Sequence, residues 1–162
     1  MVPQAADEST RIEPALAPEA IEAVRALLAK YFEWIALPLE FQYIERELAD
    51  LPGRYTAPEG GLWLSTCAGE PAGCVAFRRW DADTAEAKRL YTRPRFQGRG
   101  LGARLLDAMI AAARQAGYRR MILDTLPRMT AAQRLYERRG FMPIELYYAN
   151  PIPGALFFGR DL

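Results

Sequence analysis

A glycine-rich segment between a predicted strand and a long amphipathic helix constrains the fold of this chain more than any other feature. The strand is predicted over residues 86–92 and ends before Pro94, because proline cannot continue a hydrogen-bonded ladder. The helix is predicted over residues 101–116, where apolar side chains recur every three or four positions and Gly117 can cap the C-terminus. Three glycines at alternating positions lie at the junction: Gly98, Gly100 and Gly102. A strand, a tight turn and a helix in this order indicate a fold in which helices cover a sheet.

The hydrophobic pattern of the remaining chain predicts the element order β-αα-βββ-α-β-α-ββ. Further strands are predicted over 11–13, 62–67, 74–80, 121–125, 141–146 and 156–160, and further helices from residue 18, over 39–51 and over 130–140. A turn over 69–73 joins two of these strands in a hairpin, and Thr130 and Gln133 have the spacing of a capping box. We therefore expect an α/β (α+β) fold with a mixed central sheet of about seven strands and helices on both faces.

The composition is that of an ordinary globular domain. The 162 residues are 51% hydrophobic and 25% charged, and we expect a single domain over residues 9–162 behind a loose N-terminal tail, residues 1–8. The 21 basic and 20 acidic residues nearly balance, so no global charge attracts nucleic acid or anionic lipid. The sequence has neither an apolar stretch long enough to span a bilayer nor a secretion-signal pattern, and we expect a cytoplasmic protein without membrane partners.

The chain contains no histidine, which narrows the chemistry it can perform. A Ser-His-Asp or Cys-His catalytic pair and a histidine-ligated metal are excluded, and we expect no metal cofactor. Cys67 and Cys74 lack the spacing of a metal or redox motif and are expected to be free thiols. Proton transfer must therefore use carboxylates, tyrosine, cysteine, lysine or water.

The segment Arg93–Gly102 has the properties of a phosphate-binding turn. Its glycines allow a tight backbone turn, and the free N–H groups at the start of the following helix point their positive dipole end at a bound anion. Three arginines add positive charge: Arg93, Arg95 and Arg99. The glycine spacing fits neither the G-x-G-x-x-G pattern nor a P-loop. Taken alone, the segment also fits a tight turn with solubilising arginines.

Three blocks of sequence resemble the GNAT superfamily of acetyltransferases. Residues 97–102 match the family's Q/R-x-x-G-x-G/A motif, Thr92-Arg93-Pro94 stands where the family has V-x-P, and residues 132–141 resemble A-x-x-L-Y-E-x-x-G-F. The resemblance is sharp over residues 86–141 and looser elsewhere. It implies the GNAT acyl-CoA N-acyltransferase fold, with acetyl-CoA as cosubstrate.

The resemblance also implies where acetyl-CoA binds. In the family the fourth and fifth strands splay apart and the pantetheine arm lies between them. Backbone groups of the fourth strand would bond to this arm, here Leu90, Tyr91 and Thr92. The amides of the following turn would hold the pyrophosphate, here Gln97, Gly98, Arg99, Gly100, Leu101 and Gly102.

The catalytic residues are implied by the same resemblance. Tyr136 corresponds to the tyrosine that lies near the thioester sulfur, and we expect it to act as the general acid. Glu86 is our first candidate for the general base, on the strand where several members place a glutamate; the alternatives are Asp124 and a chain of water molecules. Glu86 is expected to share a strand face with three other residues: Lys88, Leu90 and Thr92. The chain departs from the family at Met129, where many members have asparagine.

The acceptor site is expected between the first two helices and the loop that joins the last two strands. These regions carry Tyr31, Trp34, Phe41, Tyr43, Tyr55, Tyr147, Tyr148 and Asn150. We expect an N-acetyltransferase that transfers the acetyl group to a primary amine of a small molecule, by direct attack in a ternary complex. The alternatives are a protein N-terminal or lysine acetyltransferase and a non-catalytic acyl-CoA-binding module. We expect no nucleic-acid partner, and either a monomer or a homodimer.

Overall fold

The computed structural model describes residues 9–36, 41–150 and 152–162, and the predicted tail over 1–8 lies outside this part. The elements in chain order are β1 (Thr10–Pro14), α1 (Pro18–Ile35), α2 (Phe41–Asp50), β2 (Gly61–Cys67), β3 (Glu70–Arg79), β4 (Thr84–Thr92), η1 (Pro94–Phe96), α3 (Leu101–Gln115), β5 (Arg120–Thr125), α4 (Thr130–Arg138), β6 (Met142–Pro143) and β7 (Leu156–Asp161). The strands form one seven-stranded mixed sheet in the order β1-β2-β3-β4-β5-β7-β6. The predicted fold class and element order are confirmed.

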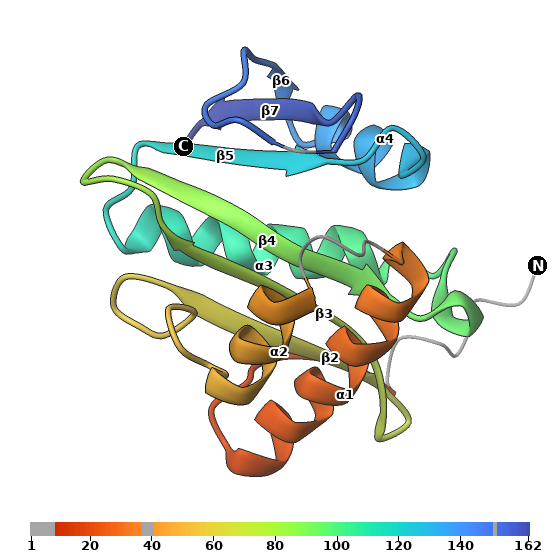
Figure 1. Cartoon of the computed structure of the whole chain (residues 1–162). Helices are drawn as coiled ribbons and strands as arrows, with labels where there is room; N and C mark the ends of the chain where they lie inside the picture. The colour runs from red at the N-terminus through yellow and green to blue at the C-terminus, as the bar shows by residue number, and fades with distance from the viewer. Residues whose placement is uncertain (1–8, 37–40, 151) are drawn as a thin grey trace, which may run out of the picture.

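Helices bury both faces of the sheet, with α3 behind it and α1 and α2 in front (Figure 1). Val75 and Phe77 of β3 pack in the core under α3, whereas Cys74 and Ala76 pack against α1. Successive side chains of a strand point to opposite faces, so a strand covered on both sides is apolar at every position. The continuous run Cys74–Phe77 follows from this double burial.

The strands β4 and β5 pair over only three positions and then part. They run parallel, with Thr84 opposite Arg120 and Glu86 opposite Ile122 as the first and last pairs. Beyond Glu86 the two strands diverge (Figure 1), as the family resemblance implied. The C-terminal half of β4 therefore lies beside a gap, and its backbone groups on that side need another partner.

A bulge in β4 changes which side chains share a face. Ala76 of β3 lies opposite Lys88, but Cys74 lies opposite Tyr91, so β4 contains one extra residue between these pairs. Arg89 takes this place with φ = 61°, a left-handed conformation that is uncommon for a residue other than glycine. As a result Leu90 packs in the α3 core, as Ala87 does. The prediction that Leu90 shares a face with Glu86 is therefore wrong.

Three local predictions also differ from the structure: the hairpin turn, the capping box and the strand over 141–146. The hairpin turn is formed by Ala68 and Gly69, both with positive φ, so the predicted turn residues 70–73 belong to β3. Pro71 is tolerated there because the β2–β3 register shifts nearby, between Ser65 and Thr66. The capping box is absent from α4, because the side-chain amide of Gln133 donates to the carbonyls of residues 126 and 127 instead.

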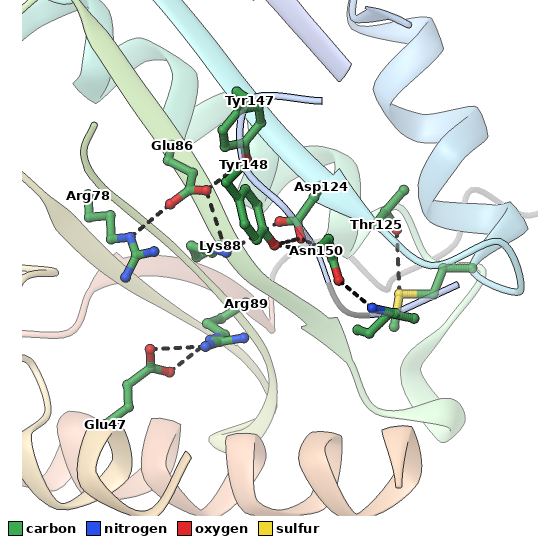
Figure 2. A network of polar contacts seen from close by, with 12 residues as sticks. Glu47, Arg78, Glu86, Lys88, Arg89, Asp124, Thr125, Tyr147, Tyr148 and Asn150 are labelled. Atoms are coloured by element: carbon green, nitrogen blue, oxygen red, sulfur yellow. Dashed lines mark hydrogen bonds and ion pairs between the residues drawn. The ribbon is translucent and has the colours of Figure 1, made fainter. Parts of the chain in front are cut away.

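The strand predicted over 141–146 is only two residues long, Met142–Pro143. Pro143 has no N–H to continue the ladder, and after Ile144 the chain leaves the sheet to form a loop that returns at β7. This loop carries Tyr147, Tyr148 and Asn150 toward the gap between β4 and β5 (Figure 2). None of the helices in the described ranges has the length and hydropathy needed to cross a membrane.

Candidate active site

A cavity of about 480 Å³ lies where β4 and β5 part. Its walls come from α1, α2, β3, β4, β5 and α4, and Leu106 and Met109 of α3 line it through the gap in the sheet. Tyr148, Asn150 and Ile152 add a wall from the loop before β7. The volume is within the range of small-ligand sites, roughly 300–1,000 Å³.

The turn before α3 offers unpaired backbone donors. Gly98 and Gly100 have φ of 78° and 77°, and a Cβ atom at either position would meet open space. These glycines are therefore required by the backbone conformation, and not by steric crowding. Within the described part of the chain, no carbonyl accepts from the N–H groups of residues 100–103. Free N–H groups at a helix start suit a phosphate.

The flanks of this turn are positively charged and held in place. Arg93 and Arg95 both bond to Glu70, at 3.0 and 2.9 Å, and both pack over Phe96 together with Arg99. Among the described residues, Glu70 is the one carboxylate paired with these three guanidinium groups, and it bonds only Arg93 and Arg95, which leaves the surface attractive to an anion. The turn therefore fits a diphosphate group.

Two residues of the predicted phosphate motif have structural roles. Gln97 donates its N–H to the Pro94 carbonyl at 3.2 Å and its side-chain amide to the Thr92 carbonyl at 3.1 Å, so its backbone donor is already engaged. At Gly102 a Cβ atom would lie 3.2 Å from Leu135, which shows that glycine here permits close packing of α3 on α4. Gln97 therefore stabilises the turn by its hydrogen bonds, and Gly102 allows α3 to pack closely on α4.

Tyr136 lies on α4 with its ring buried against Phe141 and Phe158. It lines the cavity, and its hydroxyl has no hydrogen-bond partner among the described residues. Burial raises the pKa of Tyr136 well above 10, with further contributions from Tyr31 and Asp124. The hydroxyl is therefore neutral at physiological pH and available to donate a hydrogen bond into the cavity.

Glu86 is almost fully buried, with its side chain 1% exposed, and is surrounded by donors (Figure 2). Its Oε1 accepts from Arg78 Nε at 2.8 Å, and its Oε2 accepts from the Tyr147 hydroxyl at 2.7 Å and lies 3.5 Å from Lys88 Nζ. Burial and the adjacent Glu86 carboxylate raise the pKa of Tyr147, which keeps this phenol protonated. Glu86 is thus the centre of a charged network, as a buried carboxylate must be.

Asp124 faces the same network from β5. Its Oδ1 lies 3.3 Å from Lys88 Nζ, and its Oδ2 accepts from the Tyr148 hydroxyl and from Asn150 Nδ2 at 2.9 Å. Lys88 thereby joins Glu86 to Asp124 across the point where the strands part (Figure 2). The Asp124 side chain is 15% exposed, so it is more open to the cavity than Glu86.

A third carboxylate, Glu47, fixes α2 to the bulge in β4. Arg89 donates to it through two bonds of 2.8 and 3.0 Å, and the Tyr55 hydroxyl adds a third at 2.8 Å. Burial acts to raise the pKa of Glu47, but the charge and hydrogen bonds of Arg89 outweigh it and hold the pKa below 4.5. The guanidinium of Arg89 also lies over the Phe32 ring at 4.7 Å. This ion pair forms one side of the cavity.

The structure brings together only part of the predicted acceptor site. Four of those residues line the cavity: Tyr31, Tyr43, Tyr148 and Asn150. Tyr55 and Tyr147 instead support the carboxylates, and Trp34 lies under Arg128 at the end of α1. The side chain of Phe41 lies outside the described residues. Met129 lines the cavity and takes a hydrogen bond of 3.5 Å from Thr125 through its sulfur.

Sequence reasoning did not anticipate the roles of Arg78, Glu47 and Arg89. Their contacts join residues between 8 and 42 positions apart, and no motif or local spacing relates them. Within the described ranges, no group of histidine, cysteine, aspartate and glutamate side chains has the arrangement of a metal site.

Comparison with known proteins agrees with this geometry. Residues 21–141 match the Acetyltransferase (GNAT) family. An uncharacterized N-acetyltransferase from Schizosaccharomyces pombe is 34% identical over 147 residues, which cover 90% of each chain. The N-acetylaspartate synthetase of Danio rerio is 29% identical over 113 residues, 68% of this chain and 40% of that protein.

A solved structure shows the same fold with the cosubstrate in place. A GNAT family acetyltransferase from Elizabethkingia anophelis, with acetyl-CoA bound, superposes with a TM-score of 0.67 at 24% identity and covers 96% of this chain and 100% of its own. The strand gap, the free N–H groups before α3 and the sequence match over three quarters of the chain all lead to one assignment. The chain belongs to the GNAT family of acetyltransferases and is an acyltransferase.

Proposed function

We propose that this protein transfers the acetyl group of acetyl-CoA to the primary amine of a small molecule by direct attack in a ternary complex. The observation that carries the proposal is the cavity at the point where β4 and β5 part, which contains a carboxylate network. The turn that follows β4 adds backbone amides that have no carbonyl partner among the described residues. Orientation of two bound reactants in such a site can contribute about 7–11 kcal/mol in favourable cases.

Acetyl-CoA would bind along the gap between the strands. The amides of residues 98–103 would hold the diphosphate, with Arg99 nearby and Gln97 shaping the turn. Backbone groups of Leu90, Tyr91 and Thr92 would bond to the pantetheine arm, because β5 does not pair with β4 at these positions. This arrangement would bring the thioester near Tyr136.

The reaction needs a neutral amine and a stabilised thiolate. A primary amine with a pKa of about 10.4 is mostly protonated at neutral pH, so a proton must leave before or during the attack. The nitrogen then forms a bond to the acyl carbon while the carbon–sulfur bond breaks. Tyr136, which stays protonated, would donate a hydrogen bond to the departing sulfur.

The proton acceptor belongs to the Glu86–Lys88–Asp124 network. Glu86 and Asp124 each lie within reach of three donors, so neither is a bare base. Exposure favours Asp124 for direct or water-mediated contact with the amine, while Glu86 orients Lys88 and Arg78 from behind. Glu86, the first candidate from the sequence, would then orient Lys88 and Arg78, and Asp124 would take the proton.

A small-molecule acceptor is favoured by the size of the cavity and by one relative. The cavity must hold the acetyl end of the cosubstrate as well as the acceptor, and its 480 Å³ suits a compact amine. The relative from Danio rerio is named for a small acetylated product. A cytoplasmic location and the oligomeric state stay predictions from the sequence.

A panel of amines, assayed for free CoA release, tests the proposal. We expect turnover with at least one small primary amine, and a decrease of kcat by roughly 100-fold or more in Tyr136→Phe with little change in acetyl-CoA affinity. Tyr118→Phe is the matched control, because Tyr118 is equally buried but donates to the Glu59 carbonyl outside the cavity. Binding of acetyl-CoA without turnover on any amine or peptide would indicate a non-catalytic module.

A further inference from the structure

Arg78, at the end of β3, lines the cavity, and the two terminal nitrogens of its guanidinium group form a planar fork of hydrogen-bond donors. Its Nε donates to Glu86 at 2.8 Å, but its two terminal nitrogens have no protein partner within the described part of the chain. The side chain is only 24% exposed. Arginine carries four N–H donors on these two nitrogens, and largely buried donors normally have an acceptor. The fork therefore has capacity for a ligand.

The other cations at the cavity are already committed. Arg89 makes its paired bonds to Glu47, and Lys88 lies between Glu86 and Asp124. Unlike these two cations, Arg78 has no partner for its terminal nitrogens among the residues that the structure describes. Glu86 accepts a hydrogen bond from Nε of Arg78. Figure 2 shows the Arg78 guanidinium extending from Glu86 toward the Glu47–Arg89 pair.

Arg78 also lines a second cavity of about 560 Å³, which is formed by the C-terminal half of α2 and the segment that follows it. The lining of this second cavity includes three arginines, Arg46, Arg54 and Arg78, and two carboxylates, Glu47 and Asp50. Glu47 is paired with Arg89 and Arg78 with Glu86, so two arginines remain for one carboxylate. The first cavity, by contrast, has equal numbers of cations and carboxylates. The excess of positive charge therefore lies on the Arg78 side of the site, away from Asp124, and favours an anionic group there.

We propose that Arg78 binds a carboxylate of the acceptor, so that the acceptor is a primary amine carrying a carboxylate, as an amino acid does. The planar fork matches a carboxylate through two parallel hydrogen bonds. With its carboxylate on Arg78, the acceptor's amine would extend along the Glu86–Lys88 line toward Asp124 and the thioester. This inference rests on the proposed acetyltransferase activity and names the class of its acceptor.

The test compares each amino acid with its carboxamide, which keeps the amine but replaces the carboxylate by a neutral group. For the wild-type protein, kcat/KM should be roughly 10- to 100-fold higher for the amino acid than for its carboxamide. In Arg78→Met the ion pair with Glu86 is lost, so kcat/KM should fall for both substrates, but it should fall about 10- to 100-fold further for the amino acid, mainly through KM, so that the preference disappears. Arg78→Lys, which keeps the charge beside Glu86 but lacks the fork, should retain part of the preference.

Arg79→Met is the matched control, because the neighbouring Arg79 pairs with the exposed Glu59 and lines neither cavity. It should keep the full preference, and melting temperatures should verify that all variants are folded. Equal turnover of amino acid and carboxamide by the wild-type protein would overturn the inference and leave the acetyltransferase activity intact. Loss of both substrates by the same factor in both Arg78 variants would also overturn it, because that result indicates a structural role. If acetyl-CoA binds but no amine of any kind is acetylated, the proposed function itself is refuted.

Discussion

Replacement of Glu47 by glutamine tests how far one ion pair fixes α2 over the active site. Glu47 and Arg89 are each 20% exposed and joined by two bonds of 2.8 and 3.0 Å. Removal of one partner of a buried pair costs about 3–5 kcal/mol, because the other charge remains without compensation. Glutamine keeps one carbonyl acceptor for Arg89, and both side chains keep some solvent, so we expect a loss of about 2–3 kcal/mol.

This loss is large enough to measure by thermal and urea denaturation. For a domain of this size, 1 kcal/mol corresponds to about 2–4 °C, so the melting temperature of Glu47→Gln should fall by about 4–12 °C. The urea midpoint should fall with an unchanged m-value, because the same surface is exposed on unfolding. Glu45→Gln, on the exposed side of the same helix, should stay within about 0.5 kcal/mol of the wild type. Equal stability of the Glu47 and Glu45 variants would show that the Glu47–Arg89 ion pair does not hold α2 in place.

Two further predictions concern pH and the phosphate turn. The pKa of Glu47 is held below its ordinary 4.5, so its stabilising effect is complete above that pH and is lost as the pH falls through the lower folded value. The stability difference between wild type and Glu47→Gln should therefore be constant near neutral pH and shrink below about pH 4.5 in urea titrations. Gly100→Glu should lower acetyl-CoA affinity at least roughly 100-fold by calorimetry, because it places a carboxylate where the diphosphate binds. Gly117→Glu, at the opposite end of α3, has similar backbone strain and open surroundings and should bind normally; equal losses would contradict the assignment.

The phosphate turn and the major helices were predictable because their determinants are local. Gly98 and Gly100 adopt positive φ, a conformation that glycine adopts without strain, and the apolar repeat of α3 defines one buried face. The sequence of this region therefore specifies its backbone directly. The order of the strands along the chain was predictable for the same reason, because the hydrophobic pattern locates the strands and the prolines mark where they end.

The interior of the active site was not predictable in the same way. The left-handed backbone conformation occurs at Arg89 and not at a glycine, so no residue type signals it in the sequence. The Arg89 side chain is bound by Glu47, which lies 42 residues away on helix α2. This bulge turns Leu90 to the opposite face, so a simple alternation along β4 assigns the strand's side chains incorrectly. Likewise, the network around Glu86 depends on Tyr147, which reaches it from 61 residues away because Pro143 ends the preceding strand.

In the proposed binding mode the backbone amides before α3 hold the diphosphate of acetyl-CoA, and amide NMR of the glycines detects this contact. Coenzyme A should shift the resonances of Gly98 and Gly100 strongly at saturation, whereas S-acetylpantetheine, which lacks the diphosphate, should leave them nearly unchanged. The amide of Gly117, at the far end of the same helix, serves as the internal reference. If saturating coenzyme A leaves Gly98 and Gly100 unmoved, or if both ligands shift them equally, the diphosphate does not bind at this turn.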